Sequence, residues 1–258
     1  MIEGFRYLLR RNDIVFHYPN SSRRYKVNFD LEWKYIETGY FEEAECVTRL
    51  QKIVKPGDTI IDVGANVGRY TLLFSEMVGS NGKVIGFEPD PMNFQVLREN
   101  MELNKITNAK LEEEYVTDGK GTVILSNELL GSSGSSMLSC NAATQDLIHQ
   151  VKVDSTSLDE YCQENNILPD GIKVDVEGSE WLVLKGAGQT IKSCKRWILL
   201  EFHGNILDPE SNQRIQRYFQ DEAKKTIFMD GDKVGFKHGD IISSQLPSRS
   251  HCRVLVIF

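Results

Sequence analysis

The sequence predicts an α/β protein built around a doubly wound, mostly parallel β-sheet with helices on both faces. Short apolar segments alternate with segments of helical periodicity from residue 59 onward. Segments such as Thr59–Val63 (TIIDV) and Lys83–Phe87 (KVIGF) are apolar almost throughout, as expected of strands buried on both faces. Parallel strands need crossover helices, and right-handed crossovers produce a doubly wound sheet.

Each element follows from an apolar pattern or from a residue that favours a helix end. Apolar side chains at Val47, Leu50 and Val54 predict a helix within 39–54. The segment Lys55-Pro56-Gly57 stops it. Pro91 suits the first turn of a helix, where its missing N–H costs little. The main predicted strands are Thr59–Val63, Lys83–Phe87, Ala109–Val116, Gly171–Val176, Arg196–Phe202, Thr226–Met229 and Arg253–Phe258. The other predicted helices are Val67–Val78, Pro91–Leu103, Glu180–Ile191 and Pro209–Ala223.

The regular alternation covers only part of the chain. Residues 1–38 are irregular, with strand candidates at Ile14–Tyr18 and Arg24–Phe29, and we expect an extension that packs on the core. Residues 39–258 then form the main domain. Residues 131–146 are rich in Ser and Gly and lack periodicity, so we expect a loop over the site. Whether this loop is a lid stays open, as does the oligomeric state.

Composition excludes several classes of protein. The net charge of −7 and the scattered basic pairs disfavour a nucleic-acid substrate. No apolar run reaches the length of a membrane span, so no stable membrane insertion is expected. The five cysteines form no CxxC pair and no zinc-type Cys/His spacing, so we expect reduced thiols, a cytoplasmic location and no metal site.

In a doubly wound sheet the ligand binds where the strands end, so strand ends carry the functional argument. The first strand ends in Asp62-Val63-Gly64-Ala65-Asn66-Val67-Gly68. A dinucleotide site would need G-x-G-x-x-G, but Asn66 and Arg69 occupy two of the three glycine positions. A carboxylate at Asp62 repels a pyrophosphate and attracts a ligand with ammonium and sulfonium groups. S-adenosylmethionine (SAM) carries both groups and no phosphate.

The next two strand ends extend this argument. Glu88, followed by Pro89, ends the second strand, where an acid accepts hydrogen bonds from the two ribose hydroxyls of an adenosine. Asp118 follows the third strand and is a candidate partner for the adenine amine, although Asp-Gly is also a common turn pair. The acidic first turn together with Glu88 favours SAM over NAD.

The fourth and fifth strand ends supply groups suited to proton transfer. Asp175 follows an apolar strand, and its partly desolvated position would raise its pKa and suit proton handling. Glu177 lies two residues further, and His203 ends the fifth strand in the same row. We expect His203 to be the general base, with Asp175 as the second candidate. Glu180 is instead expected at a helix N-terminus, in a structural role.

Several motifs together resemble the FkbM-type methyltransferases, over roughly residues 39–203. They are PGDTIIDVGANVGRYT (56–71), GFEPDP (86–91), TSLDEY (156–161), IKVDVEGSEWLVLKGA (172–187) and LLEFHG (199–204). The resemblance implies a Rossmann-like class I SAM methyltransferase fold and O-methylation of a hydroxyl on a sugar, glycolipid or natural product. The cofactor set expected from residues and resemblance is Asp62, Gly64, Ala65, Asn66, Gly68, Glu88, Pro89 and Asp118. The expected catalytic set on the acceptor side is His203, Asp175 and Glu177.

Three alternatives stay open from the sequence. An NAD(P)-dependent oxidoreductase shares the fold class but conflicts with the broken glycine pattern and with Asp62. A non-catalytic SAM-binding protein conflicts with the intact acids at the strand ends. A methyltransferase with a protein or nucleic acid as acceptor keeps the chemistry, and net acidity disfavours the nucleic acid.

Overall fold

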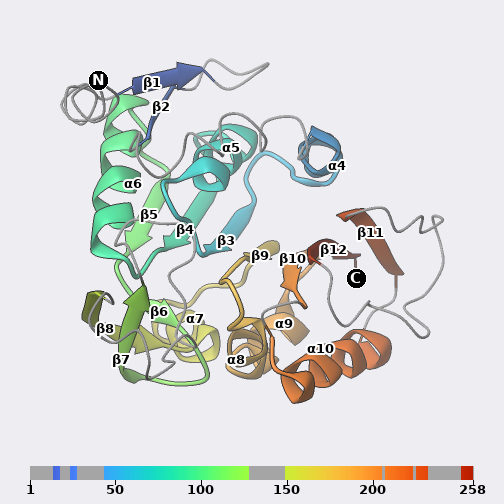
Figure 1. Cartoon of the computed structure of the whole chain (residues 1–258). Coiled ribbons are helices and arrows are strands. Elements are labelled where there is room, and N and C mark those ends of the chain that lie inside the picture. The colour runs from blue at the N-terminus through green and yellow to red at the C-terminus, as the bar shows by residue number, and fades with distance from the viewer. Residues whose placement is uncertain are drawn as a thin grey trace, which may run out of the picture.

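The computed structural model describes residues 14–17, 24–27, 44–127, 149–204, 207–222, 225–231 and 251–257. Its centre is a seven-stranded sheet with the strand order β11-β12-β10-β9-β3-β4-β5 (Figure 1). The strands are β3 (Thr59–Val63), β4 (Lys83–Phe87), β5 (Ala109–Glu112), β9 (Gly171–Val174), β10 (Trp197–His203), β11 (Lys225–Gly231) and β12 (His251–Ile257). All neighbouring pairs from β10 to β5 are parallel, whereas β12 runs antiparallel to both β10 and β11.

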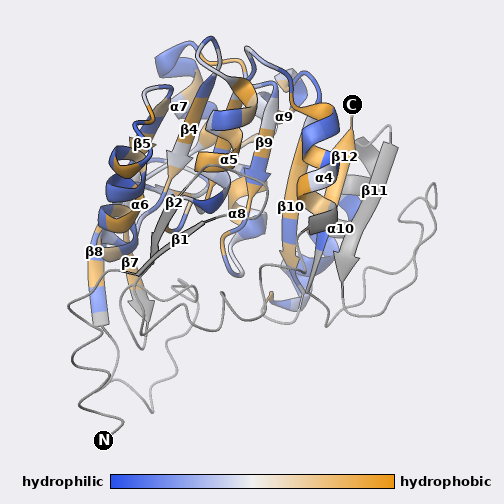
Figure 2. Ribbon diagram, turned by 90° about the horizontal axis from the view of Figure 1, so that it is seen from above, coloured by the Kyte–Doolittle hydropathy of each residue, from blue (hydrophilic) through white to orange (hydrophobic). Residues whose placement is uncertain are grey.

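Helices cover both faces of this sheet, because successive strand residues point to opposite sides. They are α4 (Ala44–Ile53), α5 (Arg69–Val78), α6 (Pro91–Leu103), α7 (Leu158–Asn165), α8 (Glu180–Lys185), α9 (Gly188–Ser193) and α10 (Pro209–Glu222). Ile60 packs with buried residues of α4 and α5, whereas Ile61 packs with buried residues of α7 to α10. The strands β10 and β12 are mostly apolar in Figure 2. The predicted α/β fold with helices on both faces is therefore confirmed.

Smaller elements lie beside the central sheet. The strands β6 (Tyr115–Val116), β7 (Gly121–Asn127) and β8 (His149–Thr156) form a three-stranded sheet in the order β6-β8-β7. The strands β1 (Ile14–His17) and β2 (Arg24–Val27) form an antiparallel hairpin, and β2 lies against α6 (Figure 1). The predicted loop at 131–146 lies outside the described residues. No helix in the described ranges has the length and apolarity that a membrane crossing requires.

The structure corrects two predicted elements and adds a helix that was not predicted. The strand predicted over Ala109–Val116 is two strands, because β5 ends at Glu112 and Tyr115–Val116 pairs with β8. The helix predicted over Glu180–Ile191 is divided into α8 and α9. Gly186 ends α8 where the chain approaches Thr117 so closely that a Cβ would lie 2.2 Å from its carbonyl oxygen. The helix α7 was not predicted, although Ser157 and Glu160 form its capping box.

Candidate active site

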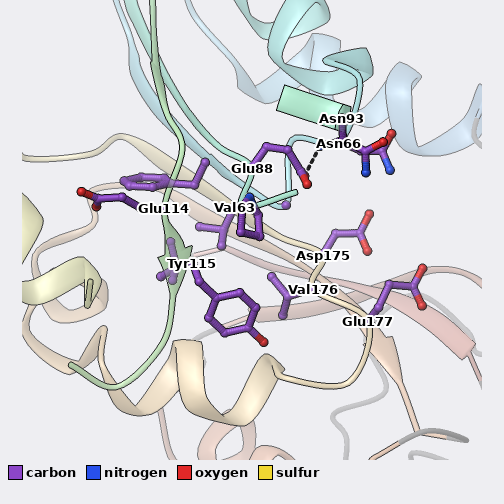
Figure 3. A pocket seen from close by; sticks show the side chains of 13 residues that line it. Val63, Asn66, Glu88, Asn93, Glu114, Tyr115, Asp175, Val176 and Glu177 are labelled. Carbon is purple, nitrogen blue, oxygen red and sulfur yellow. Dashed lines mark hydrogen bonds between the residues drawn. The ribbon is translucent and has the colours of Figure 1, made fainter. Parts of the chain in front are cut away.

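A pocket opens at the carboxyl ends of the central strands, where the strand order reverses. The loop after β3 lies between those after β4 and β9, and such a reversal point is where α/β sheets bind ligands. The pocket has an empty volume of about 630 Å³, which includes the open solvent at its mouth. Figure 3 shows the side chains that line it. They are Val63, Asn66, Phe87, Glu88, Pro89, Asn93, Glu114, Tyr115, Val116, Asp175, Val176 and Glu177, and Gly64 contributes backbone.

The turn after β3 is held by its neighbours on both sides. The N–H groups of Gly64 and Ala65 both donate to the carbonyl oxygen of Phe87, at 3.0 and 2.8 Å. Gly64 has φ 77°, and a Cβ there would lie 1.7 Å from the carbonyl oxygen of Asp175. Glycine is therefore required at this position both by conformation and by the close approach of the β9 end. The turn after β3, where the sequence predicts the cofactor, therefore lies in direct contact with Asp175, where the sequence predicts the methyl acceptor.

Asp62 is buried behind the pocket rather than in its lining. One carboxylate oxygen accepts a 2.6 Å hydrogen bond from the hydroxyl of Thr71, and the other lies 3.4 Å from Nζ of Lys173. Burial raises the pKa of Asp62, while the charge of Lys173 opposes that rise. The attraction that the sequence assigned to Asp62 is therefore already partly satisfied within the protein.

Lys173 is a buried residue behind the site that sequence reasoning missed. It lies on β9 beside Asp62 of β3, and its side chain is 3% exposed. Its Nζ lies 3.2 Å from Oδ2 of Asp175 and 4.9 Å from the centre of the Tyr70 ring. Burial lowers the pKa of Lys173, but the charges of Asp175 and Asp62 outweigh burial and raise it overall. One buried cation thus connects the Asp62 side of the site to the Asp175 side.

Glu88 lines the pocket at the end of β4 and is held by backbone donors. One of its carboxylate oxygens accepts a 2.8 Å hydrogen bond from the N–H group of Asn66 (Figure 3), and the other accepts one of 3.0 Å from the N–H group of Asp90. The side chain of Asn93 also hydrogen bonds to Glu88. Burial raises the pKa of Glu88 to about 7, although these hydrogen bonds lower it. The three donors leave one of the about four lone-pair positions of the carboxylate for a ligand hydroxyl.

The remaining predicted cofactor residues divide into two groups. Pro89 and Asn66 line the pocket, and Asn66 has φ 49°, which its short amide side chain tolerates. Ala65 and Gly68 lie behind the pocket wall, packed against α6: a Cβ at Gly68 would lie 2.6 Å from the side chain of Leu97.

The structure does not bring Asp118 to the site. Its carboxylate pairs with Nζ of Lys185 at 2.6 Å, and the side chain is 36% exposed. The strand β5 ends earlier than predicted, so Glu114 and Tyr115 occupy the pocket side of this strand end. Together with Asn93, these are the polar side chains of the pocket lining that sequence reasoning missed. The capping of α6 by Asp90, which orients the first turn of that helix, was a usable signal for Asn93.

Asp175, Glu177 and His203 come together at one end of the pocket, and we call them the acceptor cluster. Nε2 of His203 lies 3.9 Å from Oδ1 of Asp175 and 3.5 Å from Oε2 of Glu177. Glu177 has φ 48° and precedes Gly178 at φ 100°, so a left-handed turn sets its direction. Burial raises the pKa of Asp175, and it raises the pKa of Glu177 to about 7.

His203 is fixed from behind by a buried carboxylate. Its Nδ1 lies 2.6 Å from Oε1 of Glu180, a residue with no exposed surface. Burial lowers the pKa of His203, but the hydrogen bond to Glu180 and the charges of Asp175 and Glu177 raise it to about 9. An imidazole with that pKa already carries its proton at neutral pH, so in this arrangement it is not a resting general base. Glu180, expected at a helix N-terminus, begins α8 and also orients this histidine.

Comparison with known proteins agrees with this geometry. The sequence model of the FkbM methyltransferase domain matches residues 62–228, which include the pocket strands and the acceptor cluster. The hexuronic acid methyltransferase AglP of Haloferax volcanii is 28% identical over 181 residues, 67% of this chain and 67% of that protein. The 31-O-demethyl-FK506 methyltransferase FkbM of Streptomyces tacrolimicus is 26% identical over 184 residues, 61% of this chain and 70% of that protein.

Solved structures share the fold. The tRNA (uracil-54, C5)-methyltransferase of Pyrococcus abyssi, in complex with S-adenosyl-L-homocysteine, superposes with a TM-score of 0.51 at 13% identity. The match covers 96% of this chain and 44% of that protein, and it bears on the fold alone. The family assignment removes the NAD(P)-dependent oxidoreductase from the alternatives. The chain belongs to the FkbM methyltransferase family and is a SAM-dependent methyltransferase.

Proposed function

We propose that the protein transfers the methyl group of SAM to a hydroxyl of a sugar, glycolipid or natural product. The observation that carries this proposal is one continuous pocket with two chemically different ends. Glu88 and Asn66 line one end, and Asp175 and Glu177 line the other. The names of two relatives support a hydroxyl-bearing acceptor, because one acts on a hexuronic acid and the other on a 31-O-demethyl compound.

The proposed cofactor position follows from the pocket lining. Glu88 accepts the two ribose hydroxyls, one on its remaining lone pair and the other in place of the Asn93 side chain, while the N–H groups of Asn66 and Asp90 stay bound. The adenine then extends toward Glu114 and Val116, and the methionine part of SAM passes the backbone of Gly64. In this arrangement the sulfonium methyl points toward Asp175, which the close approach of Gly64 fixes in place.

The reaction needs little covalent help from the protein. An acceptor oxygen attacks the methyl carbon in line, the carbon–sulfur bond breaks, and its electron pair stays on the sulfur of S-adenosylhomocysteine. The hydroxyl proton passes to water as the new carbon–oxygen bond forms. The acceptor cluster orients the hydroxyl, and holding both reactants in a near-attack geometry supplies most of the rate.

The organisation of the chain is part of the proposal. We assign residues 39–258 to the methyltransferase domain and residues 1–38 to an extension that packs on it. The position of β2 against α6 supports the packing.

The test is a product analysis with SAM labelled at the methyl carbon. The full chain is incubated with uronic acid glycans, glycolipids, macrolides with free hydroxyls, a protein mixture and total RNA. We expect a methyl ether on a hydroxyl, identified by the NMR shift of the labelled methyl, and its loss in Asp175→Asn. A methyl ester on a uronic acid, or label in protein or RNA alone, would contradict O-methylation of a hydroxyl. Cofactor binding without any turnover would favour the non-catalytic alternative.

A further inference from the structure

The acceptor cluster has the geometry of a set of metal ligands. Asp175, Glu177 and His203 each offer one ligand atom, and these atoms all lie within 4.8 Å of one another. Ligands about 2.1 Å from a cation lie about 3.0 Å apart at right angles and about 4.2 Å apart when opposite. The distances from Nε2 of His203, 3.5 Å to Glu177 and 3.9 Å to Asp175, fall between these limits. A cation placed among the three would therefore reach all of them after small side-chain adjustments.

The charges around the cluster are unbalanced. Four carboxylates connect through it by ion-pair contacts: Asp62, Asp175, Glu177 and Glu180. Among the described residues, they face one lysine, Lys173, and the imidazole of His203. Glu201, close by, is paired with Arg253 at 3.2 Å and adds no net charge. Two of these carboxylates, Asp62 and Glu180, are fully buried, and buried carboxylates without matching cations are costly, so the site favours a further positive charge.

Glu180 provides an independent indication that this positive charge is a metal ion. It is fully buried and outside the three ligands, and its Oε1 accepts from the backbone of Gly178 while facing Nδ1 of His203 at 2.6 Å. Its Oε2 is buried and has no hydrogen-bond partner among the described residues. A carboxylate behind a histidine, on the nitrogen away from the ligand position, fixes the tautomer and orientation of metal-binding histidines. It directs Nε2 of His203 toward the two ligand carboxylates.

We propose that Asp175, Glu177 and His203 bind a divalent cation that holds the acceptor oxygen, and that the cation displaces the proton from Nε2 of His203 to water as it binds. Mn²⁺ is the cation chosen for the test, because two of the three ligands are carboxylates, which suit Mg²⁺, Ca²⁺ and Mn²⁺, while the imidazole suits transition metals. Three protein ligands on one side leave coordination positions for the acceptor hydroxyl and a neighbouring oxygen. The inference rests on the proposed function for its substrate and replaces the sequence-based expectation of no metal site.

The cation would act as a Lewis acid in the proposed reaction. Coordination lowers the pKa of the hydroxyl, and the hydroxyl proton passes to water. The resulting oxygen attacks the methyl carbon, and the electron pair of the carbon–sulfur bond remains on sulfur, so no electrons are gained or lost overall. An acceptor with two adjacent oxygens, such as a vicinal diol or a hydroxyl beside a carboxylate, chelates the cation and is favoured over an isolated alcohol.

The test measures Mn²⁺ binding directly. The full chain, saturated with S-adenosylhomocysteine, is titrated with Mn²⁺, and the free ion is followed by its electron paramagnetic resonance signal. We expect one Mn²⁺ per chain, with binding at least tenfold weaker in Glu177→Gln. The matched control is Glu164→Gln, which removes an exposed carboxylate paired with Lys120 and should leave Mn²⁺ binding unchanged. Calorimetry with S-adenosylhomocysteine confirms that each variant is folded.

The outcomes separate this inference from the proposed function. No stoichiometric Mn²⁺ binding, with normal S-adenosylhomocysteine affinity, would overturn the inference and leave His203 as the cation of the cluster. Mn²⁺ binding that Glu177→Gln does not weaken would place the ion elsewhere and overturn it equally. Tight, Glu177-dependent binding without methylation of any hydroxyl would support the metal site while contradicting the proposed acceptor.

Discussion

Glu88→Gln should weaken binding of S-adenosylhomocysteine without unfolding the protein. The two oxygens of Glu88 accept from the N–H groups of Asn66 and Asp90. In either orientation of the glutamine amide, its NH₂ group faces one of these N–H donors, and the hydrogen bond to that donor is lost because an NH₂ group cannot accept it. The substitution also removes the charge from two ribose hydrogen bonds, and hydrogen bonds to charged groups contribute about 1.5–3 kcal/mol each. Glutamine keeps one acceptor oxygen, so we expect a net loss of about 2–3 kcal/mol, roughly 30- to 150-fold in Kd.

The same residue makes cofactor affinity depend on pH. Burial raises the pKa of Glu88 to about 7, and only the carboxylate accepts both hydroxyls. Affinity should therefore rise with pH through neutrality. A group with a pKa near 7 is ionised about tenfold more at pH 8 than at pH 6, so Kd should fall about tenfold over that interval. The sign for stability is opposite: the native state binds the extra proton between about pH 4.5 and 7, so this group makes folding less favourable as pH rises.

Calorimetric titration with S-adenosylhomocysteine at pH 6, 7 and 8 measures both the loss of affinity in Glu88→Gln and the pH dependence of the affinity. Glu88→Gln serves as the control, because titration of the ligand itself appears in both proteins and only Glu88 differs. We expect a pH dependence in the unmodified chain that the variant lacks. Equal pH profiles in the two proteins would refute the assignment of Glu88 to the ribose, as would an unchanged Kd in the variant.

Three further substitutions test the packing that shapes the site. Lys173→Met leaves the fully buried carboxylate of Asp62 and the partly exposed one of Asp175 without their cation, so urea denaturation should show a loss of about 3–5 kcal/mol. A loss below about 1 kcal/mol would contradict the bridging role. Gly64→Ala places a Cβ against the carbonyl oxygen of Asp175, and we expect loss of S-adenosylhomocysteine binding in calorimetry, whereas normal binding would show that the turn adapts. Ser157→Ala removes the α7 cap and should lower the free energy of unfolding by about 1 kcal/mol at unchanged cofactor affinity.

The central strands were predictable because strands that are buried on both faces appear in the sequence as short apolar runs. Thr59–Val63 and Lys83–Phe87 were placed to the residue, since strands covered on both faces must be apolar throughout. The errors fall where tertiary contacts decide the backbone. Nothing local shows that Tyr115–Val116 leaves the central sheet to pair with β8, or that Gly186 ends α8 because Thr117 lies beside it. The start of α7, by contrast, is indicated locally by Ser157 and Glu160, whose spacing is that of a capping box.

The positions of the site residues could be predicted from the sequence, whereas their contacts could not. The positions of Glu88, Asp175 and His203 at strand ends follow from the parallel sheet alone, because all such ends share one edge. The contacts among them do not. Lys173 is one polar residue inside an apolar strand, and only the register of β9 against β3 places it beside Asp62. The raised pKa of His203 likewise depends on Glu180, whose direction the sequence does not reveal.

The position of β12 has a consequence for how the sheet is made. β12 lies between β10 and β11 and pairs with both, and β11 has no other neighbour among the described strands. Because β11 precedes β12 in the chain, it leaves the ribosome before its partner strand does. The nascent chain therefore holds β11 as an unpaired edge strand until β12 emerges and inserts beside β10. The strands at this border of the sheet thus take their places in an order that differs from their order in the sequence.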